Sequence, residues 1–205
     1  MSRRFDADTM LEALDRLAWA AVGEGVKLDV AVYGGSALML ASNFRYASED
    51  VDARLVTGEF PEWLVEAVSR IGGELGIADD WFNDDVLFHL SQEADDDRDH
   101  LPFGTFPRDG GEIGLRILVP TPEYMLALKL KAMRINDPVK GQQETADIRN
   151  LMKVVGCATP EGAVELLGKY FPRSVASPEK QLFLLRNLPP SKEEIDAPEY
   201  PVRGR

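Results

Sequence analysis

Two aspartates separated by one residue, Asp50 and Asp52, are the side chains of this sequence best suited to metal chemistry. They flank Val51 in a segment that is typical of a β-strand, and alternate side chains of a strand point to the same face. Two carboxylates on one face repel each other unless a cation lies between them, and an oxygen-only pair suits Mg²⁺ or Mn²⁺. The spacing therefore predicts a metal-binding pair.

A glycine turn precedes the two aspartates. The apolar residues 30–33 end at Gly34, Gly35 and Ser36, and a short apolar segment with helical character follows. A glycine turn placed just before a helix presents backbone N–H groups and a helix N-terminus, which bind phosphate. Metal-binding acids and a phosphate-binding turn together indicate nucleotide chemistry.

These residues resemble a known signature: Gly34-Gly35-Ser36, then Arg45, then Ser48, then Asp50-x-Asp52. It is similar to that of the nucleotidyltransferase superfamily built on the DNA polymerase β catalytic fold, and most similar to small bacterial nucleotidyltransferase-like proteins related to AbiEii-type toxins. The resemblance implies an α/β (α+β) fold with a mixed sheet flanked by helices and a helical C-terminal half. It also implies that the turn and the arginine bind NTP phosphates, and that the aspartates bind the metal.

Charged residues also fall on the apolar faces of two expected helices. Lys129 lies in the apolar arc of the helix 122–135, and Glu144 and Asp147 lie in that of the helix 142–155. Lysine is rarely buried without a partner, so we expect a buried ionic contact, most simply between Lys129 and Asp147. The alternative is a lysine that extends out of a helix interface to solvent.

The same helices extend the resemblance, through Leu128-Lys129-Leu130-x-Ala132-x-Arg134 and Asp147-Ile148-x-x-Leu151, so that it covers roughly residues 10–188. From its place in the apolar arc, the functional interpretation of Lys129 is a catalytic cation that reaches a nucleotide phosphate or the acidic site, with Glu144 and Asp147 in support. Trp81-Phe82-Asn83-Asp84 also looks like this branch. From its residues alone, that element is a polar turn held by a buried aromatic side chain.

A third carboxylate from a nearby strand usually completes the superfamily's site. Glu112 stands at the start of an expected strand, and Asp84 and Asp85 are alternatives. The three candidates stay open. If none reaches the metals, the protein binds one metal ion or binds nucleotide without efficient turnover.

The expected elements divide the chain into a nucleotidyltransferase-like core over 1–120, a helical subdomain over 121–188 and a flexible tail over 189–205. In the core we expect a helix over 7–22 capped by Asp6 or Asp8, a strand–turn–helix–strand unit over 28–56, a helix from Pro61 to about Gly72, and strands over 86–90 and 112–119. Residues 93–99 are expected to form a solvated acidic loop. In the subdomain, one helix-start signal of hydroxyl, proline and glutamate recurs at residues 121–123, 159–161 and 177–179.

The composition argues against several classes of function. The 205 residues are 44% hydrophobic and 28% charged, with no apolar run near the ~20 residues of a membrane helix and no signal peptide. The single cysteine, Cys157, fits a reducing cytoplasm and is expected to be buried. The net charge of −12 argues against coating DNA, because phosphate neutralisation needs basic groups. The two histidines have no neighbouring soft ligands, which argues against a zinc site.

The sequence and its resemblance thus predict a cytoplasmic, metal-dependent nucleotidyltransferase that moves a nucleotidyl group from NTP to a hydroxyl on RNA or protein. The resemblance to AbiEii-type toxins implies a cognate toxin or antitoxin as a partner. The alternative is an inactive relative that binds a protein partner as an antitoxin does. The 13 residues between Ser36 and Asp50, more than the usual spacing, and the acidic surface favour this alternative.

Overall fold

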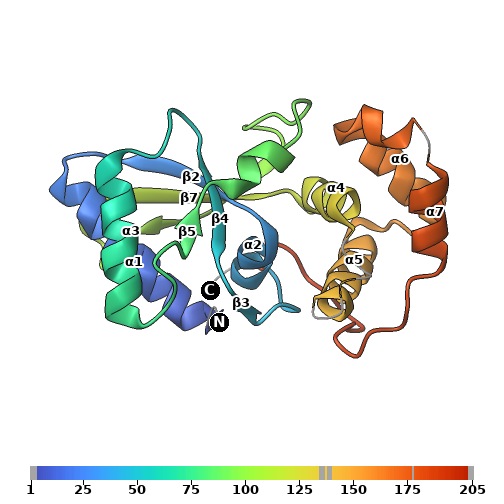
Figure 1. The fold of residues 1–205 in the computed structure, drawn as a ribbon, viewed down its shortest axis with the longest axis horizontal. Helices are drawn as coiled ribbons and strands as arrows, with labels where there is room; N and C mark the ends of the chain where they lie inside the picture. Colours follow the sequence, from blue (N-terminus) through green and yellow to red (C-terminus); the bar gives the residue numbers. More distant parts are fainter. Residues whose placement is uncertain (1–3, 134–136, 138–139, 177, 203–205) are drawn as a thin grey trace. The chain divides into compact units, whose positions relative to one another are not determined.

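The computed structural model describes residues 4–133, 137, 140–176 and 178–202 (Figure 1). Arg134 and Ser177, which belong to predicted motifs, lie outside these residues. The chain forms two compact units, which are described separately. Unit 1 comprises Met1–Ala41, Tyr46–Phe88 and Asp96–Pro120, and unit 2 comprises Ser42–Arg45, His89–Asp95 and Thr121–Arg205.

Unit 1 is built on a five-stranded mixed sheet with the strand order β5-β4-β2-β7-β6. β2 pairs parallel with β7 and antiparallel with β4, β6 pairs antiparallel with β7, and β5 pairs parallel with β4. A separate two-stranded ladder joins β1 and β3. The elements are β1 (Phe5–Asp6), α1 (Ala7–Gly23), β2 (Leu28–Val32), α2 (Gly34–Ala41), β3 (Ala47–Ser48), β4 (Val51–Leu55), α3 (Glu62–Leu75), β5 (Phe82–Asn83), the 3₁₀ helix η1 (Asp85–His89), β6 (His100–Phe106) and β7 (Leu115–Pro120).

The two faces of this sheet differ in chemistry. Residues paired across a ladder share a face, and successive residues alternate between faces. One face is apolar and buried, and carries Val30, Val32, Ala53, Leu55, Leu115, Ile117 and Val119. α1, which contacts β7, lies beside α3 (Figure 1), and their buried stripes supply apolar surface to the same core. The opposite face carries the polar side chains of β2 and β4.

Unit 2 is helical in its longest segment. Its elements are α4 (Pro122–Ala132), α5 (Gly141–Val155), α6 (Pro160–Tyr170), the 3₁₀ helix η2 (Pro172–Val175) and α7 (Glu179–Arg186). α4 contacts both α5 and α6, and α6 contacts α7. The hydroxyls of Thr121 and Thr159 accept hydrogen bonds from Tyr124 N and Gly162 N, so two of the three predicted helix starts have the expected caps.

Residues 189–202, within the segment predicted to be a flexible tail, have no helix or strand but make specific contacts with α5. Asn150, fully buried, donates to the carbonyl of Glu193 and accepts from the N–H of Ile195, at 3.2 and 3.1 Å. Lys153 Nζ donates to the carbonyl of Ile195 at 2.8 Å and pairs with Glu194 at 2.9 Å. A segment without regular structure can therefore be fixed by its backbone groups.

Several local predictions were wrong. Residues 85–89 form η1 and not a strand, because Asn83 Oδ1 accepts from Asp85 N and the carbonyl of Asp84 accepts from Leu87 N, which closes a helical turn. α3 continues through Gly72 to Leu75 and ends at Gly76, whose φ of 67° suits a left-handed cap. Position 72 needs glycine because of close packing: a Cβ there would lie 2.4 Å from the carbonyl oxygen of Ala78.

Three exposures also differ from expectation. Ile113 precedes β7 and is exposed, so the buried face of that strand begins at Leu115. Asp99 is buried and paired with Arg98, although it ends the acidic loop that was expected to be solvated. Cys157 is only half-buried. None of the described helices combines the length and hydropathy that crossing a bilayer requires.

Candidate functional site

The predicted turn and the second predicted aspartate meet in unit 1. Gly34 has a φ of 64°, and a Cβ added to it would lie 2.6 Å from Oδ2 of Asp52. The carboxylate of Asp52 therefore lies directly against the turn. The backbone holds the two together, because Tyr33 N donates to the carbonyl of Asp52 at 2.8 Å. Glycine is required here both for the left-handed φ and for the close approach of the carboxylate.

The turn opens α2 as predicted. Gly34 and Gly35 are half-buried and begin the helix, so their N–H groups belong to the first turn, which has no partners within a helix. Ser36 is buried, and its hydroxyl donates to the carbonyl of Tyr33 at 2.8 Å. The serine proton is thus used to close the turn, so any anion bound at this turn would be held by its backbone N–H groups.

Asp50 lies one residue before β4 and is half-buried, like Asp52. Its carbonyl accepts from the hydroxyl of Ser48 at 3.0 Å, which fixes the backbone at the entry to the strand. Within the described residues, no group of three or more His, Cys, Asp or Glu side chains could hold a metal ion. Mg²⁺ that is bound together with substrate phosphates is usually held by one or two carboxylates, so a two-aspartate donor set fits such an ion.

The three candidates for a third carboxylate lie at different places in the fold of unit 1. Glu112 is exposed and precedes β7, which is separated from β4 by β2. Asp84 and Asp85 directly follow β5, the neighbour of β4, and Asn83 on β5 pairs in register with Asp52. The sheet order therefore brings the chain around Asp84 nearer to Asp52 than that around Glu112.

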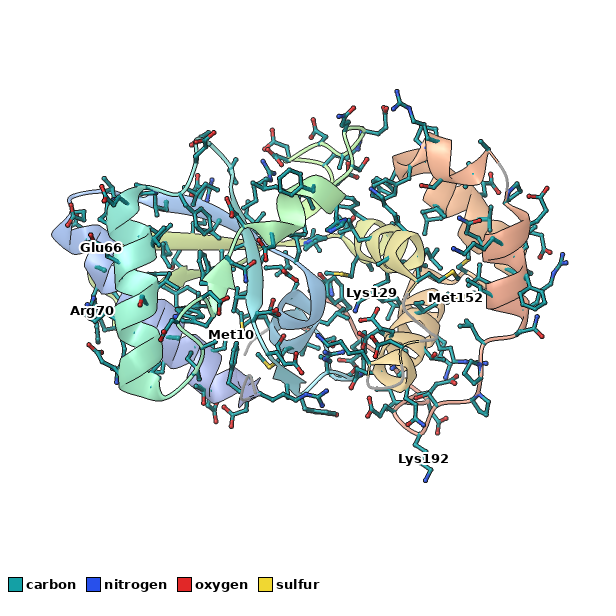
Figure 2. All side chains as sticks on the ribbon, in the orientation of Figure 1. Met10, Glu66, Arg70, Lys129, Met152 and Lys192 are labelled. Atoms are coloured by element: carbon teal, nitrogen blue, oxygen red, sulfur yellow. The ribbon has the colours of Figure 1, made fainter. Side chains whose placement is uncertain are left out.

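The other predicted site residues form a cluster in unit 2. Lys129 Nζ on α4 lies 2.8 Å from Oδ2 of Asp147 and 3.0 Å from Oε1 of Glu144, both on α5. Arg45 Nη1 lies 2.9 Å from the same Oδ2, and Gln143 Nε2 donates to Oδ1 of Asp147 at 3.2 Å. The buried contact between Lys129 and Asp147 that the helical pattern predicted is confirmed. Lys129, labelled in Figure 2, does not extend to solvent.

Charge in this cluster is balanced, since two cations face two carboxylates. The side chain of Asp147 is 0% exposed and that of Lys129 is 7% exposed. Burial lowers the pKa of Lys129, but the charges of Asp147 and Glu144 outweigh burial and hold the pKa above its ordinary value. Lys129 is therefore an ammonium ion at neutral pH, and its charge is compensated where it lies.

Comparisons of the chain with protein-family profiles, with curated proteins and with solved structures found no match. Any function assigned to the site therefore depends on its geometry and chemistry.

A polar network in unit 1 was not predicted from the sequence. Tyr33 OH lies 2.9 Å from His100 Nε2, and Arg54 Nε donates to the same hydroxyl at 3.4 Å. Arg54 Nη2 also pairs with Asp96. Strand alternation could have identified Arg54, since it lies two residues after Asp52 on β4. The contact between Tyr33 and His100 had no local signal, because 67 residues separate them.

Proposed function

We propose that this chain is a metal-dependent nucleotidyltransferase, which moves a nucleotidyl group from an NTP to a hydroxyl on RNA or protein. The observation that carries the proposal is the contact of Asp52 with the turn at Gly34. Asp52 would hold a divalent cation beside a turn whose backbone N–H groups suit phosphate, and that cation would supply charge neutralisation for the phosphate groups.

Metal binding and phosphate binding are assigned to different residues of unit 1. Asp50 and Asp52 would hold Mg²⁺ or Mn²⁺, and Gly34 and Gly35 would orient the β- and γ-phosphates through backbone N–H groups. The bound metal supplies charge stabilisation as pyrophosphate leaves. Positioning by fixed backbone groups raises the rate because the reacting groups no longer need to find one another.

Arg45 and Lys129 have a structural role in this proposal and do not bind phosphate. We predicted that both would offset phosphate charge, but each contacts Asp147 in unit 2. We propose that the four-charge cluster fixes the segment 42–45, which follows α2, against α5.

Transfer can be tested with purified protein, Mg²⁺ and each of the four NTPs labelled on the α-phosphate, in the presence of cell RNA and protein. We expect label on one of these acceptors. The variant Asp50→Ala/Asp52→Ala should lose it, whereas the exposed control Asp79→Ala should keep it. Labelling that survives in the double variant would refute the proposed roles of the aspartates.

A second candidate function is a catalytically inactive, antitoxin-like module that binds a protein partner. The balanced cluster favours it, because both predicted phosphate-binding cations are already paired with carboxylates. Calorimetry with Mg²⁺ and NTP separates the two candidates. Saturable binding supports the transferase, and no binding together with a co-purifying toxin supports the module.

A further inference from the structure

Arg54 lies on the same face of the sheet as Asp52. The two residues are separated by one position on β4. Ala31 on β2 opposes Arg54, and Tyr33, directly after β2, donates its N–H to the carbonyl of Asp52. At a rise of about 3.3 Å per residue, Arg54 and Asp52 are about 7 Å apart along the strand. Neighbouring phosphoryl groups of one polyphosphate can therefore lie beside Arg54 and beside a cation that Asp52 would hold.

The guanidinium of Arg54 has two kinds of partner. Its Nε is held by the hydroxyl of Tyr33, which is 1% exposed and which also contacts the buried His100. Its Nη2 is paired with Asp96, whose side chain is 41% exposed. The first partner belongs to the core. The second comes from the acidic loop before β6 and is open to solvent.

This difference decides which partner can be exchanged. An ion pair with an exposed carboxylate contributes little net free energy, because water and salt screen it and because both side chains lose freedom. The part-buried hydrogen bond to the hydroxyl of the buried Tyr33 keeps the guanidinium oriented when the carboxylate leaves. A phosphoryl group carries more charge than a carboxylate and accepts two parallel N–H bonds from arginine.

The other arginine on this face provides a contrast. Arg116 on β7 pairs with Asp29 on β2 through two hydrogen bonds, of 2.8 and 2.6 Å, so both carboxylate oxygens are engaged. Asp96 contacts Arg54 through one oxygen, Oδ1, which also lies 3.8 Å from Nδ1 of His100, beyond hydrogen-bond distance. The pair of Arg54 and Asp96 is therefore the less constrained of the two.

We infer that Arg54, oriented by Tyr33, is a phosphoryl-binding residue beside Asp52, and that Asp96 occupies its anion position until a polyphosphate displaces it. The ligand class follows from the proposed function, on which this inference rests: the phosphoryl groups would be those of an NTP. Asp96 then competes with the ligand, so removing its charge strengthens phosphoryl binding.

The test uses inorganic tripolyphosphate, without metal and with a chelator, titrated calorimetrically at low salt into the full chain. Exchange of Asp96 for Asn should tighten binding about fivefold, because a competing pair of this strength is removed. Arg54→Gln should weaken binding at least tenfold, and Arg54→Lys should retain part of it. Asp97→Asn, in the same acidic loop, and Arg116→Gln, on the same face, should stay within twofold of the unmodified protein.

The inference is overturned if Asp96→Asn binds no more tightly than Asp97→Asn, if Arg54→Gln binds as the unmodified protein does, or if neither the unmodified protein nor Asp96→Asn binds. Circular dichroism and urea unfolding establish that each variant is folded. Because the titration contains no metal, its result is separate from the test of transfer. If the unmodified protein transfers no label but binds tripolyphosphate as expected, the result counts against the transferase and supports the phosphoryl-binding site.

Discussion

Gly34 is a residue at which one added methyl group reaches the carboxylate of Asp52. Exchange for alanine forces a non-glycine residue into a φ of 64°, which costs about 1–2 kcal/mol, and places a Cβ against Asp52. We expect Gly34→Ala to lose binding of Mg²⁺–NTP at least tenfold, measured by calorimetry. Gly58→Ala is the matched control, because Gly58 has a φ of 81° but open space around its Cβ position. Equal losses of nucleotide binding in both variants would contradict the role of the contact with Asp52.

Lys129 tests the charged cluster of unit 2. Removal of one partner from a buried ion pair leaves uncompensated charge and costs about 3–5 kcal/mol. We therefore expect Lys129→Met to lower the free energy of unfolding by that amount at pH 7, measured in urea. Arg70→Met removes an exposed helix pair on α3, labelled in Figure 2, and should have a much smaller effect. A loss for Lys129→Met no larger than that for Arg70→Met would show that the cluster is not structural.

The sign of the pH dependence follows from the raised pKa of Lys129. A group whose pKa is raised in the folded state stabilises it below the unfolded pKa, and this stability is lost as the pH rises through the folded value. The difference between the unmodified protein and Lys129→Met should therefore be constant from pH 6 to 9. It should decline only under alkaline conditions above the ordinary lysine pKa of about 10.4.

At the scale of the elements, α1 shows how a cap sets a helix boundary. Asp6 accepts from Thr9 N at 2.9 Å, and this hydrogen bond lowers the pKa of its carboxyl. We expect Asp6→Ala to reduce stability by about 1 kcal/mol near pH 7. Because the folded pKa is lowered, this contribution is present above the unfolded value and fades as the pH falls through the folded one. Thermal unfolding from pH 7 to 2 measures it, and Asp8→Ala, in the same first turn, should show a smaller loss. A pH-independent difference would contradict the cap.

Elements with strong local signals could be predicted from the sequence. α1 begins after its acidic cap, Asp6, and ends at Gly23. The contact of Lys129 with Asp147 follows from helical periodicity alone. Predictions failed where distant residues decide the outcome. Gly72 looked like a stop signal, but its small size allows the chain at Ala78 to pack against α3. β6 contains Pro102 and Gly104 and has no alternating pattern, so its pairing with β7 could not be predicted from the local sequence.

The same distinction between local and distant signals applies to the candidate site. Alternation on β4 and the turn at Gly34 are local features, and the contact of Asp52 with that turn agrees with them. The partners of Arg45 and Arg54 depend on residues that are 102 and 42 positions away in the chain. No spacing rule indicates such contacts, and these contacts determine whether an arginine is available to a ligand.

At the scale of the whole molecule, residues 189–202 extend unit 2 beyond its last helix. Removal of residues 189–205 breaks the hydrogen bonds of Asn150 and Lys153 with this segment. At about 1 kcal/mol per hydrogen bond, we expect a loss of about 2–4 kcal/mol in the urea unfolding of the truncated chain. Lys192→Ala, exposed in the same segment (Figure 2), is the control and should leave stability unchanged. A truncated chain as stable as the full one would show that the segment is a free tail.

The most direct measurement is calorimetric titration of Mg²⁺–NTP into the unmodified protein, Asp52→Asn and the exposed control Asp79→Asn. Because Asp52 adjoins the turn at Gly34, we expect saturable, metal-dependent binding that is at least tenfold weaker in Asp52→Asn and unchanged in Asp79→Asn. Binding of equal strength in all three proteins, or no binding of any NTP, would contradict a metal–nucleotide site at this turn.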